Sequence, residues 1–137
     1  MKSMGEPRIR VIAMPKDTNP AGNIFGGWLL SQIDLAGALA AREVAPERTV
    51  TISMKEVLFK EPVFVGDAVS FYSRITHVGT TSITVIVKVV VQRFDHNAKG
   101  LICVPVTEAE VTYVSMDEAG NKKPIDSELK KFADFKQ

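Results

Sequence analysis

One segment, residues 28–44, constrains the fold of this chain more than any other. It reads Trp-Leu-Leu-Ser-Gln-Ile-Asp-Leu-Ala-Gly-Ala-Leu-Ala-Ala-Arg-Glu-Val, which has the length of a helix and almost no polar face. Ser31, Gln32 and Asp34 are its only polar side chains before Arg42. A helix that is apolar all round is normally buried all round. We therefore predict that this helix is the centre of the fold.

Asp34 stands out because it puts a carboxylate in the middle of that apolar helix. Burying a carboxylate costs free energy unless another group pairs with it or the site uses it. Asp34 is therefore the first candidate for a functional residue. The alternative is a structural carboxylate that accepts hydrogen bonds from backbone amides of a partner.

The rest of the chain reads as strands and connections. Alternating apolar and polar residues predict strands over residues 8–14, 49–59, 68–78, 82–94 and 102–116. We expect hairpin connections to make the last four antiparallel, with Pro105 at a bulge or an edge. Asn23 is a candidate cap for the helix. The tail, residues 117–137, should carry a short amphipathic helix from Asp126, with Leu129, Phe132 and Phe135 on its apolar side.

This order of elements predicts a single domain over residues 1–137, of class α+β, with a core over residues 8–116. One helix cannot cover both faces of a five-stranded sheet, but the sheet can curl around the helix. The side of the helix that stays uncovered, and the edge of the sheet, would leave apolar surface exposed in a monomer. We therefore expect a homodimer.

Composition limits the classes of partner. The 137 residues include 17 basic and 16 acidic side chains, for a net charge of +1, which argues against bulk capture of nucleic acid or of an acidic membrane. Cys103, the single cysteine, excludes an intrachain disulfide and a cysteine-based zinc cluster, and we expect no metal. The amino terminus is polar, with no signal-peptide pattern, and no apolar run reaches membrane-spanning length. A cytoplasmic protein is the default expectation.

The loop before the helix carries a recognisable pattern, which is Asn19, Gly22, Phe25, Gly26 and Gly27, followed by Asp34. Two later stretches agree with it, Phe59-x-x-Pro62-x-x-x-Gly66-Asp67 and Val78-Gly79-Thr80-Thr81-Ser82. Over about residues 8–116 the chain resembles the hotdog-fold acyl-CoA thioesterases, and most of all the short bacterial acyl-CoA hydrolases of the YciA type. The resemblance implies a curved antiparallel sheet of about five strands wrapped around one long helix.

The same resemblance implies hydrolysis of acyl-CoA, with coenzyme A as part of the substrate and no separate cofactor. It also implies a homo-oligomer, with a hexamer built as a trimer of dimers as the expectation beyond the dimer. Three rival interpretations stay open. One is a purely structural dimer module, which would not explain a carboxylate in an apolar helix. A non-catalytic acyl-CoA sensor would usually lack the acid and add a DNA-binding element. A hotdog hydratase or dehydratase would want a catalytic histidine near the helix start, where this chain has Phe25.

Thioester hydrolysis needs a stabiliser for the oxyanion and a base or a nucleophile. The amino end of a buried helix offers free N–H groups and a positive dipole end, so the Gly26 N–H is the candidate oxyanion donor, with Gly27 beside it. Asp34 is the candidate general base or nucleophile. The resemblance assigns Asn19 to orienting the water or the thioester. The alternatives are that Asn19 only forms a turn and that the two glycines serve packing alone.

Helix geometry adds a constraint on these roles. Gly26 and Asp34 are eight residues apart, which is about 12 Å along a helix axis at 1.5 Å per residue. Both cannot touch one carbonyl carbon from the same helix. If both act, Gly26 of one subunit must meet Asp34 of the other, and the site lies across the dimer interface.

The remaining candidates concern substrate binding. Phe25, where many members of the superfamily have histidine, is expected to shape the acyl or pantetheine channel. Thr80, Thr81 and Ser82 are candidates for lining the pantetheine path, although the start of a strand is an equally good interpretation. The basic residues that would hold the 3′-phosphate of coenzyme A are not fixed by the sequence, and the candidates are Lys55, Lys60 and Arg74.

Overall fold

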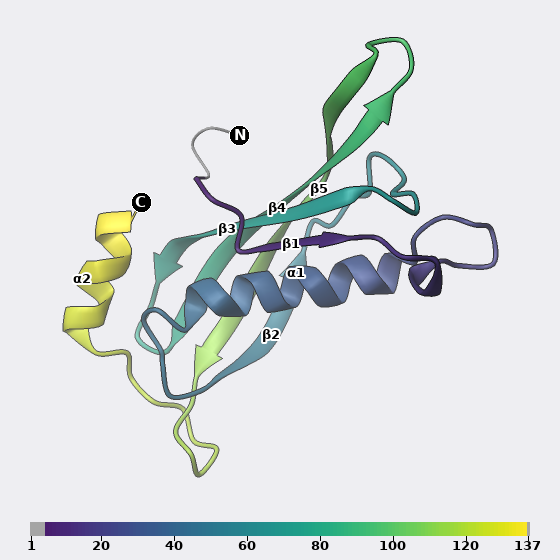
Figure 1. Cartoon of the computed structure of the whole chain (residues 1–137). Coiled ribbons are helices and arrows are strands. Elements are labelled where there is room, and N and C mark those ends of the chain that lie inside the picture. The colour runs from purple at the N-terminus through teal and green to yellow at the C-terminus, as the bar shows by residue number, and fades with distance from the viewer. Residues whose placement is uncertain (1–4, 137) are drawn as a thin grey trace.

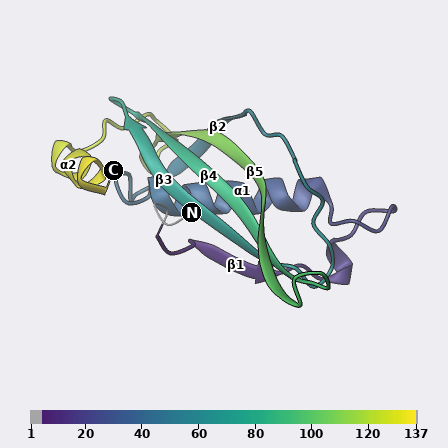
Figure 2. The same cartoon turned by 90° about the horizontal axis from the view of Figure 1, so that it is seen from above.

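A computed structural model of the chain describes residues 5–136. In it, one long helix lies against one curved sheet, and a second, short helix follows near the C-terminus (Figure 1). The strands are β1 (Ile9–Ile12), β2 (Thr49–Lys55), β3 (Ala68–Val78), β4 (Ser82–Asp95) and β5 (Gly100–Ser115), and the helices are α1 (Gly26–Ala41) and α2 (Ser127–Lys136), with a 3-10 turn at Pro15–Asp17. All strand pairs are antiparallel, in the order β1-β3-β4-β5-β2. Seen from above, the strands cross over α1 (Figure 2). The predicted fold class is confirmed.

The position of β2 corrects one prediction. The sequence suggested that the strand after the helix forms a hairpin with β3, but β2 pairs with β5 at the opposite edge of the sheet. The connection over residues 56–67 is too long for a tight hairpin loop, and it instead crosses from one side of the sheet to the other. Because α1 lies across the inner face, β1 before it and β2 after it become the two edge strands.

Smaller boundaries also shift. The helix ends at Ala41, where we expected it to continue to about Val44, because the next turn tightens: the Glu43 and Val44 amides donate to Ala40 and Ala41, each at 3.1 Å. The bulge expected near Pro105 is confirmed. The β4–β5 register changes between Val89 and Val90, and Val90 lies opposite Pro105.

The core lies between α1 and the inner face of the sheet. The helix buries Leu29, Ile33, Ala36, Gly37, Ala40 and Ala41. Its other side is uncovered in the single chain: Leu35 is 55% exposed and lies with Ala38 and Leu39 in an open hollow of about 650 Å³. Burial all round is therefore wrong for one chain, and the uncovered apolar face is the one that led us to expect a dimer.

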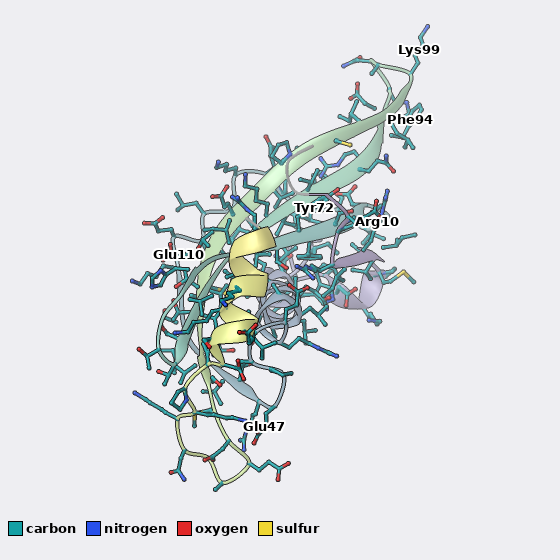
Figure 3. All side chains as sticks on the ribbon, turned by 90° about the vertical axis from the view of Figure 1, so that its left-hand side faces the viewer. Arg10, Glu47, Tyr72, Phe94, Lys99 and Glu110 are labelled. Carbon is teal, nitrogen blue, oxygen red and sulfur yellow. The ribbon has the colours of Figure 1, made fainter. Side chains whose placement is uncertain are left out.

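Two segments extend from this body. The β4–β5 hairpin projects away from it, with Phe94 and Lys99 at its far end (Figures 1 and 3). In α2, Ala133 is buried and Leu129 packs against the core. The side chains of Phe132 and Phe135, predicted on the same face, lie outside the described residues. Within residues 5–136, no helix is long and apolar enough to span a membrane.

A buried ion pair anchors the crossing connection. The Arg93 guanidinium donates to both carboxylate oxygens of Asp67, at 3.2 and 2.7 Å, and lies over the Phe64 ring. One of those oxygens also accepts the Phe64 amide at 2.9 Å. The Asp67 side chain is only 4% exposed, so solvent screens the pair little.

We expect Asp67→Asn to lower the free energy of unfolding by about 3 kcal/mol, because removing one partner leaves a poorly solvated charge behind. The matched control is Glu108→Gln, which breaks an exposed pair with Lys88 at 4.0 Å and should change stability by less than about 0.5 kcal/mol. Denaturant unfolding of both variants measures the difference. Equal losses of unfolding free energy in the two variants would show that the Asp67–Arg93 pair does not stabilise the crossing connection.

Candidate active site

The loop before α1 is held by the side chain of Asn19. Its Oδ1 accepts the amides of Ala21 at 3.0 Å and Asn23 at 3.1 Å, and its own amide donates to the Asn23 carbonyl at 2.7 Å. Asn19 is therefore a turn-forming residue. Its Nδ2 has no hydrogen-bond acceptor among the described residues, so both of its N–H donors stay available for another task.

The predicted helix cap is wrong. The residue at the N-cap position is Phe25, two residues after Asn23, and no side chain bonds to the first helical amides. The Asn23 amide and carbonyl are both hydrogen-bonded to Asn19 in the turn that precedes the helix. Asn23 is therefore part of this turn and does not cap the helix.

The first amides of α1 are free. Its first backbone hydrogen bonds run from Trp28 at 3.1 Å and Leu29 at 3.4 Å to the Phe25 carbonyl, and within residues 5–136 the N–H groups of Gly26 and Gly27 have no acceptor. Unpaired amides at the positive end of a helix dipole are suited to stabilising negative charge. The helix start therefore has the geometry expected of an oxyanion donor.

Two aromatic rings flank these glycines. A Cβ on Gly27 would lie 2.8 Å from the Phe25 ring, so the ring folds across this position and would have to shift to admit a side chain there. A Cβ on Gly26 would lie 3.7 Å from the Phe59 ring, an ordinary contact. Phe25 and Phe59 are 54% and 45% exposed, which leaves apolar walls beside the free amides.

Asp34 is held from the sheet by two hydroxyl groups. Its carboxylate Oδ1 accepts the Thr51 hydroxyl at 2.8 Å, and its main-chain carbonyl accepts the Tyr113 hydroxyl at 2.7 Å. Thr51 and Tyr113 are cross-strand partners of β2 and β5. Sequence reasoning missed both residues. A tyrosine in a core-facing strand position needs a hydrogen-bond partner, which was the one available signal, whereas nothing in the sequence marked Thr51.

A single chain does not bring all the candidates together. Gly26 and Asp34 lie on the same helix, about 12 Å apart along its axis. The turn that carries Thr80 and Thr81 is at the end of β3 remote from the helix start (Figure 1). There the Thr81 and Thr80 carbonyls accept the amides of Ser115 and Ile125. A pantetheine-binding role for Thr80, Thr81 and Ser82 stays a prediction.

The candidate phosphate-binding cations have mixed surroundings. Lys60 lines a hollow of about 460 Å³ on the sheet together with Glu56, Glu108 and Glu110, and Lys55 pairs with Glu110 in the sheet register. Carboxylates so close to the lysines oppose a phosphate. Arg74 lies on β3, and its Nε is buried without a partner among the described residues. These three assignments stay predictions.

Known proteins match the architecture and align with most of the chain's length. The Thioesterase superfamily profile matches residues 21–93. A hexameric hotdog fold thioesterase of Campylobacter jejuni has a structure with a TM-score of 0.91 and 61% identity, covering 96% of this chain and 98% of that one. The acyl-CoA thioester hydrolase YciA of Escherichia coli K12 is 40% identical, covering 88% of this chain and 91% of its own.

A more distant structure adds a ligand-bound relative. The acyl-CoA hydrolase of Staphylococcus aureus, in complex with butyryl coenzyme A, coenzyme A and coenzyme A disulfide, has a TM-score of 0.72 and 27% identity, covering 92% of this chain and 78% of that one. The fold is therefore a hotdog fold. The chain belongs to the thioesterase superfamily and is similar to its YciA-type members.

Proposed function

We propose that this protein hydrolyses acyl-CoA thioesters to a free acid and coenzyme A. The observation that carries the proposal is that α1 has both free amides at its start and a carboxylate held by Thr51. Relatives of the chain are named acyl-CoA thioester hydrolases. The Gly26 N–H donates to the thioester carbonyl oxygen as negative charge develops on it. The exposed rings of Phe25 and Phe59 are suited to contact the apolar part of the substrate.

Asp34 supplies the second half of the reaction. As a base, it takes a proton from water, the hydroxide adds to the carbonyl carbon, the carbon–sulfur bond breaks, and the thiolate of coenzyme A leaves and is protonated. As a nucleophile, its carboxylate attacks the carbonyl carbon, the carbon–sulfur bond breaks, the thiolate of coenzyme A leaves and is protonated, and water then hydrolyses the mixed anhydride to the free acid and the Asp34 carboxylate. Both routes stay open. In this proposal the free Nδ2 of Asn19 orients the water or the thioester, and the reaction uses no separate cofactor.

The working unit in this proposal is a dimer. Because Gly26 and Asp34 are too far apart along α1 to act on one thioester, each site combines the oxyanion donor of one subunit with the carboxylate of the other. The uncovered helix face around Leu35 supplies apolar surface for the contact between subunits. The Campylobacter jejuni relative is hexameric, and we extend the proposal to a trimer of dimers.

The direct test is the release of free thiol from acyl-CoAs of increasing chain length, with a chelator present. We expect hydrolysis by the purified protein and an unchanged rate with the chelator. Binding of every acyl-CoA with no thiol release would overturn the proposal in favour of a non-catalytic sensor. Loss of activity with the chelator would overturn the cofactor-free mechanism.

A further inference from the structure

Tyr113 is a fully buried polar residue that the proposed chemistry does not use. Its side chain is 1% exposed, and it is the largest of the fully buried side chains. A buried tyrosine hydroxyl needs a partner. Here it donates, at 2.7 Å, to the main-chain carbonyl of Asp34, which is a carbonyl in the middle of α1. The sheet therefore contacts the helix at the residue that carries the candidate carboxylate.

Gly37 makes room for that contact. A Cβ at this position would lie 2.2 Å from the Tyr113 hydroxyl oxygen and 3.1 Å from two ring carbons. Glycine is a poor residue in the middle of a helix, yet it sits one turn after Asp34 inside the core. The Tyr113 hydroxyl fills this gap in the helix surface. A hydrogen bond and a steric fit together fix both the rotation of α1 and its position along its axis.

The geometry of the sheet links this contact to the carboxylate itself. Tyr113 on β5 and Thr51 on β2 are directly paired, and Thr51 donates to the Asp34 carboxylate at 2.8 Å. The β2–β5 register shifts immediately after Thr51, so Ile52 is an extra residue at a bulge. Bulges of this kind re-aim neighbouring side chains and are common next to active sites. One cross-strand pair thus holds both the main chain and the side chain of Asp34.

We propose that Tyr113 and Gly37 form a positioning pair, which sets the depth and rotation of α1 so that the Asp34 carboxylate meets the Thr51 hydroxyl. The inference rests on the proposed hydrolase function and deepens it. Neither residue touches the substrate. Their effect on the rate is through the placement of Asp34, since displacing a reacting group by about 1 Å can cost up to about 100-fold.

The protonation state of Tyr113 fits this role. Burial, with a further contribution from the nearby charge of Asp34, raises the pKa of the Tyr113 phenol far above its usual range. The hydroxyl therefore stays protonated, and stays a donor, at every pH at which the enzyme would be assayed.

The first test is Tyr113→Phe, which keeps the ring and removes only the donor. We expect kcat to fall about tenfold with KM nearly unchanged, because substrate binding does not involve Tyr113. The matched control is Tyr72→Phe, since Tyr72 is the other tyrosine and its neighbours Phe71 and Ser73 are the buried residues that face inward, which puts Tyr72 on the outer face of the sheet. It should stay within about twofold of the wild type. Equal kcat values for Tyr113→Phe and the wild type would overturn the proposal.

The second test is a pair of double-variant cycles. We expect Gly37→Ala to lower kcat by about tenfold in the wild type, because the added Cβ pushes against the Tyr113 hydroxyl, but by much less in the Tyr113→Phe protein, where that oxygen is gone. In the Asp34→Asn protein, Tyr113→Phe should cause no further loss of kcat, because Tyr113 acts through the Asp34 carboxylate, which that protein lacks. Additive effects in both cycles would mean a purely structural role. Activity of the wild type itself is measured first, so failure of the proposed function is recognised separately.

Discussion

Asp34→Asn should lower kcat for acyl-CoA hydrolysis by at least about 100-fold. Asparagine has nearly the same size, and its amide oxygen can still accept the Thr51 hydroxyl that now lies 2.8 Å from Oδ1. It can neither take a proton from water nor form an anhydride. The loss should therefore fall on kcat, because the aromatic walls and the free amides that would bind the substrate are unchanged.

The control is the same Asp→Asn substitution at an aspartate outside the proposed site, which removes a carboxylate charge without touching the proposed chemistry. Asp126 is exposed, and its Oδ1 accepts the Glu128 amide at 2.8 Å ahead of α2, a bond that asparagine can also accept. Asp126→Asn should keep activity within about twofold of the wild type. Both variants are compared by thiol release and by denaturant unfolding. If Asp34→Asn keeps full activity, Asp34 has no part in the reaction, and its bond to Thr51 is only structural.

The sequence was sufficient to single out Asp34 as a candidate because the signal is local. An apolar helix with one internal carboxylate is visible in a single segment, and the alternation of residues 82–94 marks a core strand in the same way. Alternation reports which face of a strand is buried, but it does not report which strand lies beside it. That is why the hairpin expected between β2 and β3 is wrong, although all five expected strands are present, with β2 ending at Lys55 where we expected residue 59.

The residues that hold Asp34 could not be predicted for the same reason. Thr51 reaches the carboxylate only because β2 pairs with β5 and because a bulge follows at Ile52. Both facts depend on contacts between segments far apart in the chain. The cap assigned to Asn23 failed differently, since Asn23 and Asn19 have the same local chemistry and only the loop conformation distinguishes them.

Gly26→Pro should abolish most of the activity while keeping the helix. Proline is well tolerated at the first helical position, and Phe25 already has φ −63° and ψ 129°, a conformation compatible with a following proline. The substitution removes one N–H group, which has no acceptor among the described residues. Loss of an oxyanion donor costs about 100-fold or more in kcat.

Gly26→Ala is the control for that variant, because it keeps the N–H group and its Cβ would meet the Phe59 ring at 3.7 Å, an ordinary contact. It should stay within about threefold of the wild type. Thiol release by the two variants measures the difference. Equal activity of the proline and alanine variants would remove the Gly26 amide from the mechanism, and the free amide of Gly27 would become the candidate donor.

Co-expression of Gly26→Pro with Asp34→Asn tests whether the site spans two subunits. In a mixed dimer, the intact Gly26 of one chain meets the intact Asp34 of the other at one of the two sites, while the second site has both defects. Random assortment makes half of the dimers mixed, so about a quarter of the wild-type activity should return from two inactive parents. A trimer of such dimers gives the same average. Tags on the two chains verify that both are present in one assembly, and activity no higher than that of the parents would place each site within a single chain.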